Sequence, residues 1–131
     1  MPASDDPEEE ARDAFDALVG RAVEAIPEPY ASALRSVAIV VEDAPLPGQV
    51  PPGQMLFGLY QGVPRTTWAA DWVPVPAKIT IYRRPHEIRY PDPVARQQGV
   101  EDTVRHEIAH HLGVDEAGIR SIEAERRAHR G

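Results

Sequence analysis

Apolar residues recur with helical spacing in the first part of the chain. Asp6 and Pro7, followed by three glutamates, form a typical helix start, because aspartate can cap the first amide groups and acids favour the positive end of the helix dipole. One face of the following helix is expected to be apolar through Phe15, Leu18, Val19, Ala22, Val23 and Ile26. Pro27 and Pro29 are expected to end this helix, and residues 30–34 to form a further short turn.

Three short apolar runs in the middle of the chain predict β-strands. The β-branched run at residues 37–41 is typical of a buried strand, and residues 55–60 predict a second strand. Residues 78–82 predict a third strand with alternating character, whose edge is a candidate for pairing with an extended peptide. Prolines and glycines between residues 44 and 54 indicate a loop within one domain, and residues 62–64 indicate a turn.

A second long helix is predicted to begin at Asp92 and Pro93, which repeat the capping signal of the first. Its core face is expected to consist of Val100, Val104, Ile108 and Leu112. A different face carries two histidines and two small residues, namely His106, His110, Gly99 and Thr103. The small residues would leave room for a ligand beside the histidines, although Gly99 is also compatible with a break in the helix.

Residues 106–116 read H-E-x-x-H-x-x-G-x-x-E and carry the candidate chemistry of the chain. Two histidines four residues apart lie roughly 40° apart around a helix, so His106 and His110 can face one metal ion. Glu107 lies between them and can take a proton from a metal-activated water, which is the role of a general base in peptide-bond hydrolysis. Gly113 can end the helix in a left-handed conformation, so that a third ligand returns from beyond the turn.

Two neighbouring acids, Asp115 and Glu116, are the candidates for the third metal ligand. The spacing of extended motifs of this type favours Glu116, which stands ten residues after His106. Asp115 has an alternative role as the N-cap of a final helix containing Ile119 and Ile122. The turn could also present Asp115 to the metal, so both assignments stay open.

The chain has no cysteine, which excludes disulfides, thiolate ligands and a cysteine nucleophile. A metal must therefore be held by nitrogen and oxygen ligands. Histidine with carboxylate suits one Zn²⁺ ion, although iron, cobalt and nickel accept the same ligand types.

Four further side chains, two tyrosines and two histidines, carry polar groups. Tyr60 and Tyr82 each carry a hydroxyl that could stabilise a tetrahedral intermediate, although half-buried strand aromatics are the commoner case. His111 lies about 100° from His110 around the helix, so we expect it to pack or to bond a carbonyl near the helix end rather than bind metal. His86 stands in a proline-containing loop and is given no role.

The length of 131 residues suits a single domain over residues 1–131, with about residues 1–6 and 127–131 expected to be disordered. No apolar run approaches the length of a membrane span, and the acidic N-terminus lacks the order of a signal peptide. A soluble, cytoplasmic protein with no membrane partner is therefore expected. The net charge of −7 argues against a nucleic-acid partner. Nothing in the pattern indicates an oligomeric state.

Together these segments resemble the minimal zincins, a family of compact bacterial zincin-like metallopeptidases. The resemblance is carried by the motif at residues 106–113, the strand end at residues 79–85 and the strand at residues 56–60, and it covers most of residues 12–125. It implies an α/β (α+β) fold with a small mixed β-sheet packed on helices, an active-site helix and one metal site. It also implies hydrolysis of a peptide or protein substrate.

The chain departs from that family at one position. The third ligand there is usually aspartate, whereas this chain carries Glu116, with Asp115 one residue earlier. So small a domain also supplies few walls for a substrate cleft. The alternative interpretation is therefore a catalytically inactive metal-binding or peptide-interaction module on the same scaffold.

Overall fold

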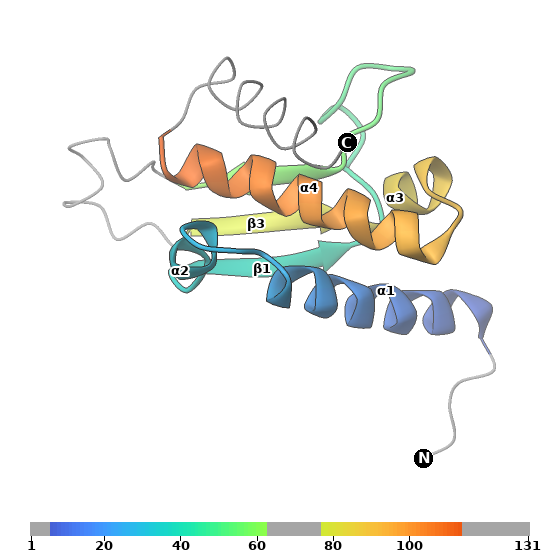
Figure 1. Cartoon of the computed structure of the whole chain (residues 1–131). Coiled ribbons are helices and arrows are strands. Elements are labelled where there is room, and N and C mark those ends of the chain that lie inside the picture. The colour runs from blue at the N-terminus through green and yellow to red at the C-terminus, as the bar shows by residue number, and fades with distance from the viewer. Residues whose placement is uncertain (1–5, 63–76, 114–131) are drawn as a thin grey trace.

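The computed structural model describes residues 6–62 and 77–113, which contain helices on a small sheet (Figure 1). The helices are α1 (Pro7–Glu24), α2 (Tyr30–Leu34), α3 (Arg83–Arg89) and α4 (Pro93–His111), and the strands are β1 (Val37–Glu42), β2 (Gly58–Gln61) and β3 (Ala77–Tyr82). None of these helices is long and apolar enough to cross a membrane. The chain termini and the helix expected after Gly113 lie outside the described residues.

The sheet is mixed and has the strand order β1-β3-β2. β1 runs parallel to β3, and β2 runs antiparallel to it. The predicted α+β class with a small mixed sheet is therefore confirmed. β3 is the central strand, and the side chains of residues 79–82 are buried. The prediction that this strand offers a free edge to a peptide is wrong, because β1 and β2 occupy both of its edges.

The outer two strands also differ from their predictions. The sequence predicts a buried strand at residues 37–41, but the side chains of β1 are half-buried or exposed. Within the described residues β1 pairs with a neighbour on one side only, so it keeps contact with solvent. β2 begins at Gly58 rather than at residue 55, and the apolar residues before it line a pocket.

α1 has the predicted start and the predicted core face. The Asp6 carboxylate accepts a hydrogen bond from the Glu8 N–H at 3.0 Å, and Pro7 occupies the first helical turn. The buried residues of the helix are Phe15, Leu18, Val19 and Ala22. They form one core with Ile79 and Ile81 of β3 and with the apolar face of α4. α2 confirms the predicted short turn at residues 30–34.

α4 lies across the sheet beside α1 (Figure 1) and carries the histidine motif near its end. Asp92 caps it by accepting a hydrogen bond from the Ala95 N–H at 2.9 Å. Val100, Val104 and Ile108 are fully buried, as predicted. The opposite side of the helix is thereby left for the histidines, and their position relative to the sheet is set by this apolar face.

Gly99 does not break α4. A Cβ atom added there would lie 2.3 Å from Cε2 of the Tyr90 ring, which is closer than side chains approach each other. The glycine therefore lets the aromatic ring lie directly on the helix. The interpretation of Gly99 as a helix break is therefore wrong, and the space that it leaves is occupied by the Tyr90 ring.

α3 is missed by sequence reasoning, which places His86 in a loop. Pro85 is the third residue of this helix, where its missing N–H is harmless, because the first amides of a helix have no partner within it. His86 is consequently fully buried rather than exposed. Its ring packs against Phe57 with 5.1 Å between ring centroids.

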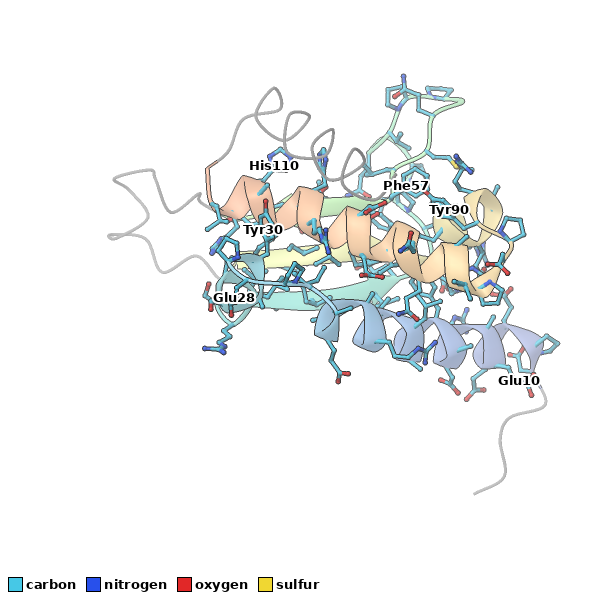
Figure 2. All side chains as sticks on the ribbon, in the orientation of Figure 1. Glu10, Glu28, Tyr30, Phe57, Tyr90 and His110 are labelled. Atoms are coloured by element: carbon cyan, nitrogen blue, oxygen red, sulfur yellow. The ribbon has the colours of Figure 1, made fainter. Side chains whose placement is uncertain are left out.

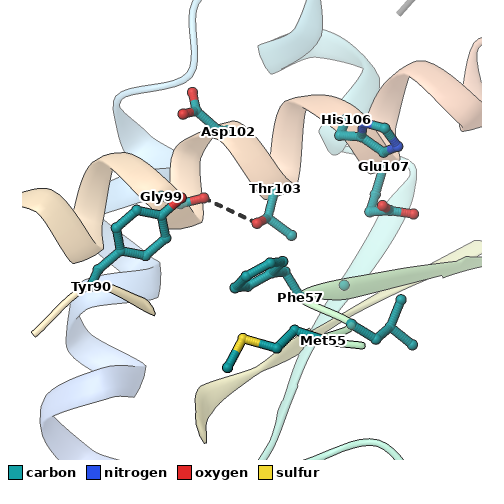
Figure 3. Close-up of a pocket in the computed structure, with 10 residues that line it drawn as sticks. Met55, Phe57, Tyr90, Gly99, Asp102, Thr103, His106 and Glu107 are labelled. Carbon is teal, nitrogen blue, oxygen red and sulfur yellow. Dashed lines mark hydrogen bonds between the residues drawn. The ribbon is translucent and has the colours of Figure 1, made fainter. Parts of the chain in front are cut away.

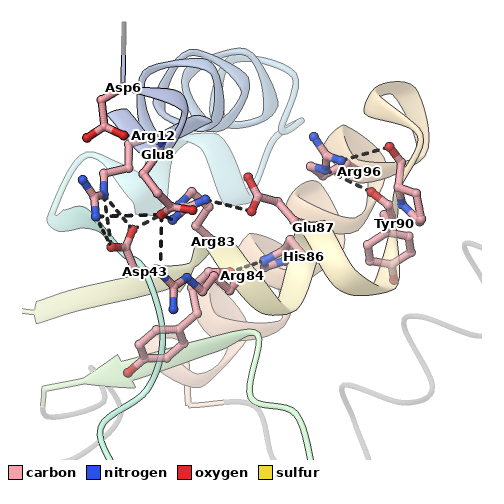
Figure 4. A network of polar contacts seen from close by, with 12 residues as sticks. Asp6, Glu8, Arg12, Asp43, Arg83, Arg84, His86, Glu87, Tyr90 and Arg96 are labelled. Atoms are coloured by element: carbon pink, nitrogen blue, oxygen red, sulfur yellow. Dashed lines mark hydrogen bonds and ion pairs between the residues drawn. The ribbon is translucent and has the colours of Figure 1, made fainter. Parts of the chain in front are cut away.

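Buried Arg83, at the start of α3, ties three elements together (Figure 4). Its guanidinium donates to Glu8 at 2.7 Å, to Asp43 at 3.0 Å and to Glu87 at 2.8 Å. The pKa of the Glu8 carboxyl is lowered, mainly by its hydrogen bond from Arg83, and that of Asp43 is lowered first by Arg12 and then by Arg83. Glu8 and Asp43 therefore stay ionised beside the buried cation, and their bonds to Arg83 fix α3 against α1 and the end of β1.

Candidate metal centre and active site

His106, Glu107 and His110 lie together near the end of α4. One ligand atom of each residue lies within 4.8 Å of those of the other two. The two imidazole rings meet edge to face, with their centroids 5.2 Å apart. Both histidines are half-buried, while Glu107 is 9% exposed. The spacing of four residues thus brings two nitrogen ligands to one side of the helix, and the intervening acid reaches the same place.

The helix ends where the motif predicts. α4 stops at His111, and Gly113 follows with φ of 79°, the left-handed conformation that favours glycine. The Gly113 N–H donates to the His110 carbonyl at 2.9 Å, which satisfies one of the last carbonyls of the helix. Asp115 and Glu116, the two candidates for a third ligand, lie outside the described residues.

Strand β2 lies close against α4 at Glu107. A Cβ atom added to Gly58 would lie 2.6 Å from Cγ2 of Thr103 and 3.3 Å from Cγ of Glu107, so only glycine allows this approach. Two residues further along β2, the backbone N–H of Tyr60 donates to Oε1 of Glu107 at 3.0 Å. The carboxylate is therefore held by the backbone of the neighbouring strand.

The Tyr60 hydroxyl has a partner within the protein. It lies 2.9 Å from Nδ1 of His111, and Nε2 of that histidine lies 3.2 Å from Oγ of Ser36. His111 is 4% exposed. It packs near the helix end as predicted, but it bonds hydroxyls and not the expected carbonyl. Burial raises the pKa of the Tyr60 phenol. Tyr60 is thus a half-buried strand aromatic, the case that the sequence favours, and its hydroxyl lies against His111.

Tyr82 is a strand aromatic with a buried ring. Its side chain is 1% exposed, and its hydroxyl donates to the side chain of Gln49 at 3.4 Å. Burial raises the pKa of this phenol as well. Tyr82 is therefore a strand aromatic, as the sequence favours, although its ring is fully rather than half buried.

A pocket of about 310 Å³ opens beside the histidine motif (Figure 3). Its lining is Met55, Leu56, Phe57, Gly58, Tyr90, Gly99, Asp102, Thr103, His106 and Glu107. Figure 3 shows His106 and Glu107 at one end and Tyr90 with Gly99 at the other. In Figure 2, Tyr90 and Phe57 lie together beside α3, while His110 stands toward the far end of α4. The pocket therefore combines an apolar floor with a polar end at the motif.

The pocket wall is supported by a buried histidine that sequence reasoning left without a role. Nε2 of His86 lies 2.9 Å from Oγ1 of Thr103, and Nδ1 lies 2.7 Å from the Tyr82 carbonyl. Since a carbonyl only accepts, Nδ1 carries the proton. Burial lowers the pKa of His86. The only signals in the sequence are the small residues Gly99 and Thr103, which indicate space on that face of α4.

The donor set of the cluster fits a metal of the zinc type. Two imidazole nitrogens and a neighbouring carboxylate are the groups that zinc and related divalent ions accept in catalytic sites. All three come from one helix that is fixed by its buried apolar face. His106 and His110 could therefore hold an ion, with Glu107 beside it.

One comparison with known proteins bears on the whole arrangement. The family model for zincin-like metallopeptidases matches residues 34–126, more than two thirds of the chain. The match includes all of the described sheet, α4, the histidine motif and the two candidate acids beyond it. No curated protein matches the chain significantly.

Proposed function

Since this chain belongs to the zincin-like metallopeptidase family, we propose that it is a zinc-dependent peptidase. In this proposal His106 and His110 bind one zinc ion, Glu107 is the general base, and Glu116 is the third ligand. The observation that carries the proposal is the cluster of the first three side chains within 4.8 Å of one another on α4. The family implies a metal, and this cluster supplies the ligands that a metal needs.

The chemistry divides between the ion and the chain. When bound, zinc would act as a Lewis acid that brings the pKa of a water molecule toward about 7. His106 and His110 each provide one imidazole nitrogen, and the helix fixes the separation between the two nitrogens. Glu107 accepts a proton from the attacking water and delivers it to the amine that leaves when the peptide bond breaks. The Tyr60 N–H orients the carboxylate for this transfer.

The pocket supports a peptide substrate with a large apolar side chain next to the bond that is cleaved. Met55, Phe57 and Tyr90 provide apolar surface within about 310 Å³, a volume that accommodates such a side chain. Glu107 and His106 form the end of the same pocket. A substrate side chain bound in the pocket would bring the adjoining peptide bond close to Glu107. Binding energy would then be used to orient that bond for cleavage.

The proposal is tested with a mixed peptide library. We expect zinc-loaded protein to cleave peptides with a phenylalanine, leucine or methionine beside the cleaved bond at least about tenfold faster than peptides with glycine or aspartate there. Protein stripped of metal should cleave none, and zinc should restore cleavage. A protein that binds zinc but cleaves no library member would instead be a metal-binding module without peptidase activity, the second interpretation of the sequence.

The two acids beyond Gly113 are separated by a pair of variants. We expect Glu116→Ala to lose zinc affinity by at least about tenfold while the apo protein keeps its melting temperature. Asp115→Ala should keep the zinc and lose about 1 kcal/mol of apo stability, the typical contribution of an N-cap. Zinc titration and melting of both apo variants measure this. The opposite pattern would assign the ligand to Asp115.

A further inference from the structure

We propose that Tyr60 is a positioning residue for Glu107. Its backbone amide holds the carboxylate, and its hydroxyl, acting through His111, keeps that amide in place. This inference rests on the proposed function, in which Glu107 is the general base. It concerns how the strand beside the active-site helix prepares that base for proton transfer.

The backbone of β2 is arranged so that the Tyr60 amide is available to Glu107. The Tyr82 N–H of β3 donates to the Phe57 carbonyl at 3.0 Å. Bonding groups alternate along an antiparallel ladder, so the N–H of Tyr60, three residues further, points away from β3. It meets Oε1 of Glu107 at 3.0 Å. A donor fixed in a strand sets the direction of the carboxylate more firmly than a mobile side chain would.

The side chain of Tyr60 touches the same helix one turn later. Glu107 and His111 are four residues apart, so they project from one side of α4. Tyr60 bonds Glu107 through its amide and His111 through its hydroxyl. One strand residue therefore bonds the helix at two points, one turn apart.

The protons of this chain of bonds can be assigned from its ends. The Ser36 hydroxyl donates to the Ala33 carbonyl at 3.0 Å, so it can only accept from His111. His111 thus donates through Nε2–H, and its Nδ1 accepts from the Tyr60 hydroxyl. Every donor then has one acceptor. These hydrogen bonds link Tyr60 of β2 to Ser36, just after α2, through His111 at the end of α4. In this proposal they hold the strand in one position against the helix.

The consequence is that catalysis depends on a residue that touches neither the substrate nor the metal. A general base must lie within hydrogen-bond reach of its proton, and displacements of 1 Å already reduce rates strongly. Without the Tyr60 amide, the Glu107 carboxylate would lose the backbone donor that sets its direction. The proposed zinc ligands would stay in place, because the position of α4 that carries them is set by its buried apolar face.

The test replaces a single backbone amide with an ester. Nonsense suppression can install the hydroxy-acid analogue of tyrosine at position 60, which removes the N–H and keeps the side chain. The same analogue at position 82 is the matched control, since it removes a sheet bond to Phe57 and leaves Glu107 untouched. For the ester at 60 we expect kcat to fall about 10- to 100-fold, with zinc affinity and KM changing less than about twofold.

A side-chain variant tests the contribution of the Tyr60 hydroxyl. We expect Tyr60→Phe, which removes the bond to His111, to lower kcat about 3- to 10-fold, while Tyr82→Phe has no such effect. If the esters at 60 and 82 lowered kcat equally, sheet stability alone would explain the loss and the proposal would be wrong. Loss of zinc together with kcat in the ester at 60 would overturn it too.

A second readout does not require peptidase activity. Labelling tyrosine with ¹⁵N gives one backbone amide signal for each of the four tyrosines in the chain. Replacing Glu107 with glutamine should move the Tyr60 amide signal further than those of Tyr30, Tyr82 and Tyr90. A larger shift at any of those three would overturn the proposed contact. If the parent cleaves no peptide but the Tyr60 signal moves as expected, the proposed function fails while the contact stands.

Discussion

Replacing His106 or His110 with alanine is expected to lower zinc affinity by more than about 100-fold, because losses of 10- to 100-fold already follow removal of groups that only support a ligand. Each histidine provides one of the two imidazole nitrogens in the cluster on α4. The parent protein should bind one zinc ion. Metal analysis and competition with a chromogenic chelator would measure stoichiometry and affinity for all three proteins.

The matched control is the neighbouring histidine of the same helix. His111→Asn removes an imidazole whose nitrogens face Tyr60 and Ser36. We expect it to keep zinc affinity and to lose stability, because it disturbs buried hydrogen bonds. If His106→Ala and His110→Ala bound zinc as tightly as the parent, the ion would be held elsewhere. A parent that binds no zinc when supplied with it would contradict the zinc proposal altogether.

The helices that sequence reasoning predicts well are those with a capping signal and a long apolar period. Asp6 and Asp92 are each followed by a proline and each cap the start of a helix. Each of these helices buries residues of its predicted apolar face. Such signals are local, because a cap and a period of 3.6 residues are read within one segment. The histidine motif is local as well, because its residues lie within two turns of one helix. His106, Glu107 and His110 therefore converge as their spacing predicts.

The errors concern features that depend on distant parts of the chain. Strand order decides which strand is central, and nothing within residues 78–82 records that β1 and β2 flank β3. The α3 helix contains a proline and only seven residues, too few for a clear period. His86 acquires its role only when Thr103, seventeen positions later, packs against it. Polar pairing across such separations is invisible to a pattern of hydrophobic positions.

Tyr60 illustrates the same limit inside the candidate site. In the sequence it is one aromatic residue of an apolar run, and the pattern does not indicate which group its hydroxyl bonds. The bond to His111 spans 51 positions and needs the close approach that Gly58 allows between β2 and α4. A glycine in a strand is a recognised signal of close backbone approach, but it does not name the group that approaches.

The motif assigns Glu107 a task distinct from metal binding, and one substitution separates the two. Glu107→Gln keeps the size of the side chain and can still accept a hydrogen bond from the Tyr60 N–H, but it cannot take up a proton. We therefore expect zinc affinity and melting temperature to stay close to those of the parent. Peptide cleavage should fall by about 10²- to 10⁴-fold, the usual contribution of a general base.

Glu101→Gln is the control, since it makes the same chemical change on the same helix, outside the cluster and the pocket lining. It should cleave the best library peptide as fast as the parent. Steady-state kinetics on zinc-saturated samples of the three proteins measure this, with metal content determined on each. Equal rates for Glu107→Gln and the parent would mean that another group takes the proton or that a contaminating peptidase is responsible. Loss of zinc in Glu107→Gln would make the carboxylate a ligand rather than a base. The combination of intact metal and lost turnover is the outcome that only a general base beside a metal explains.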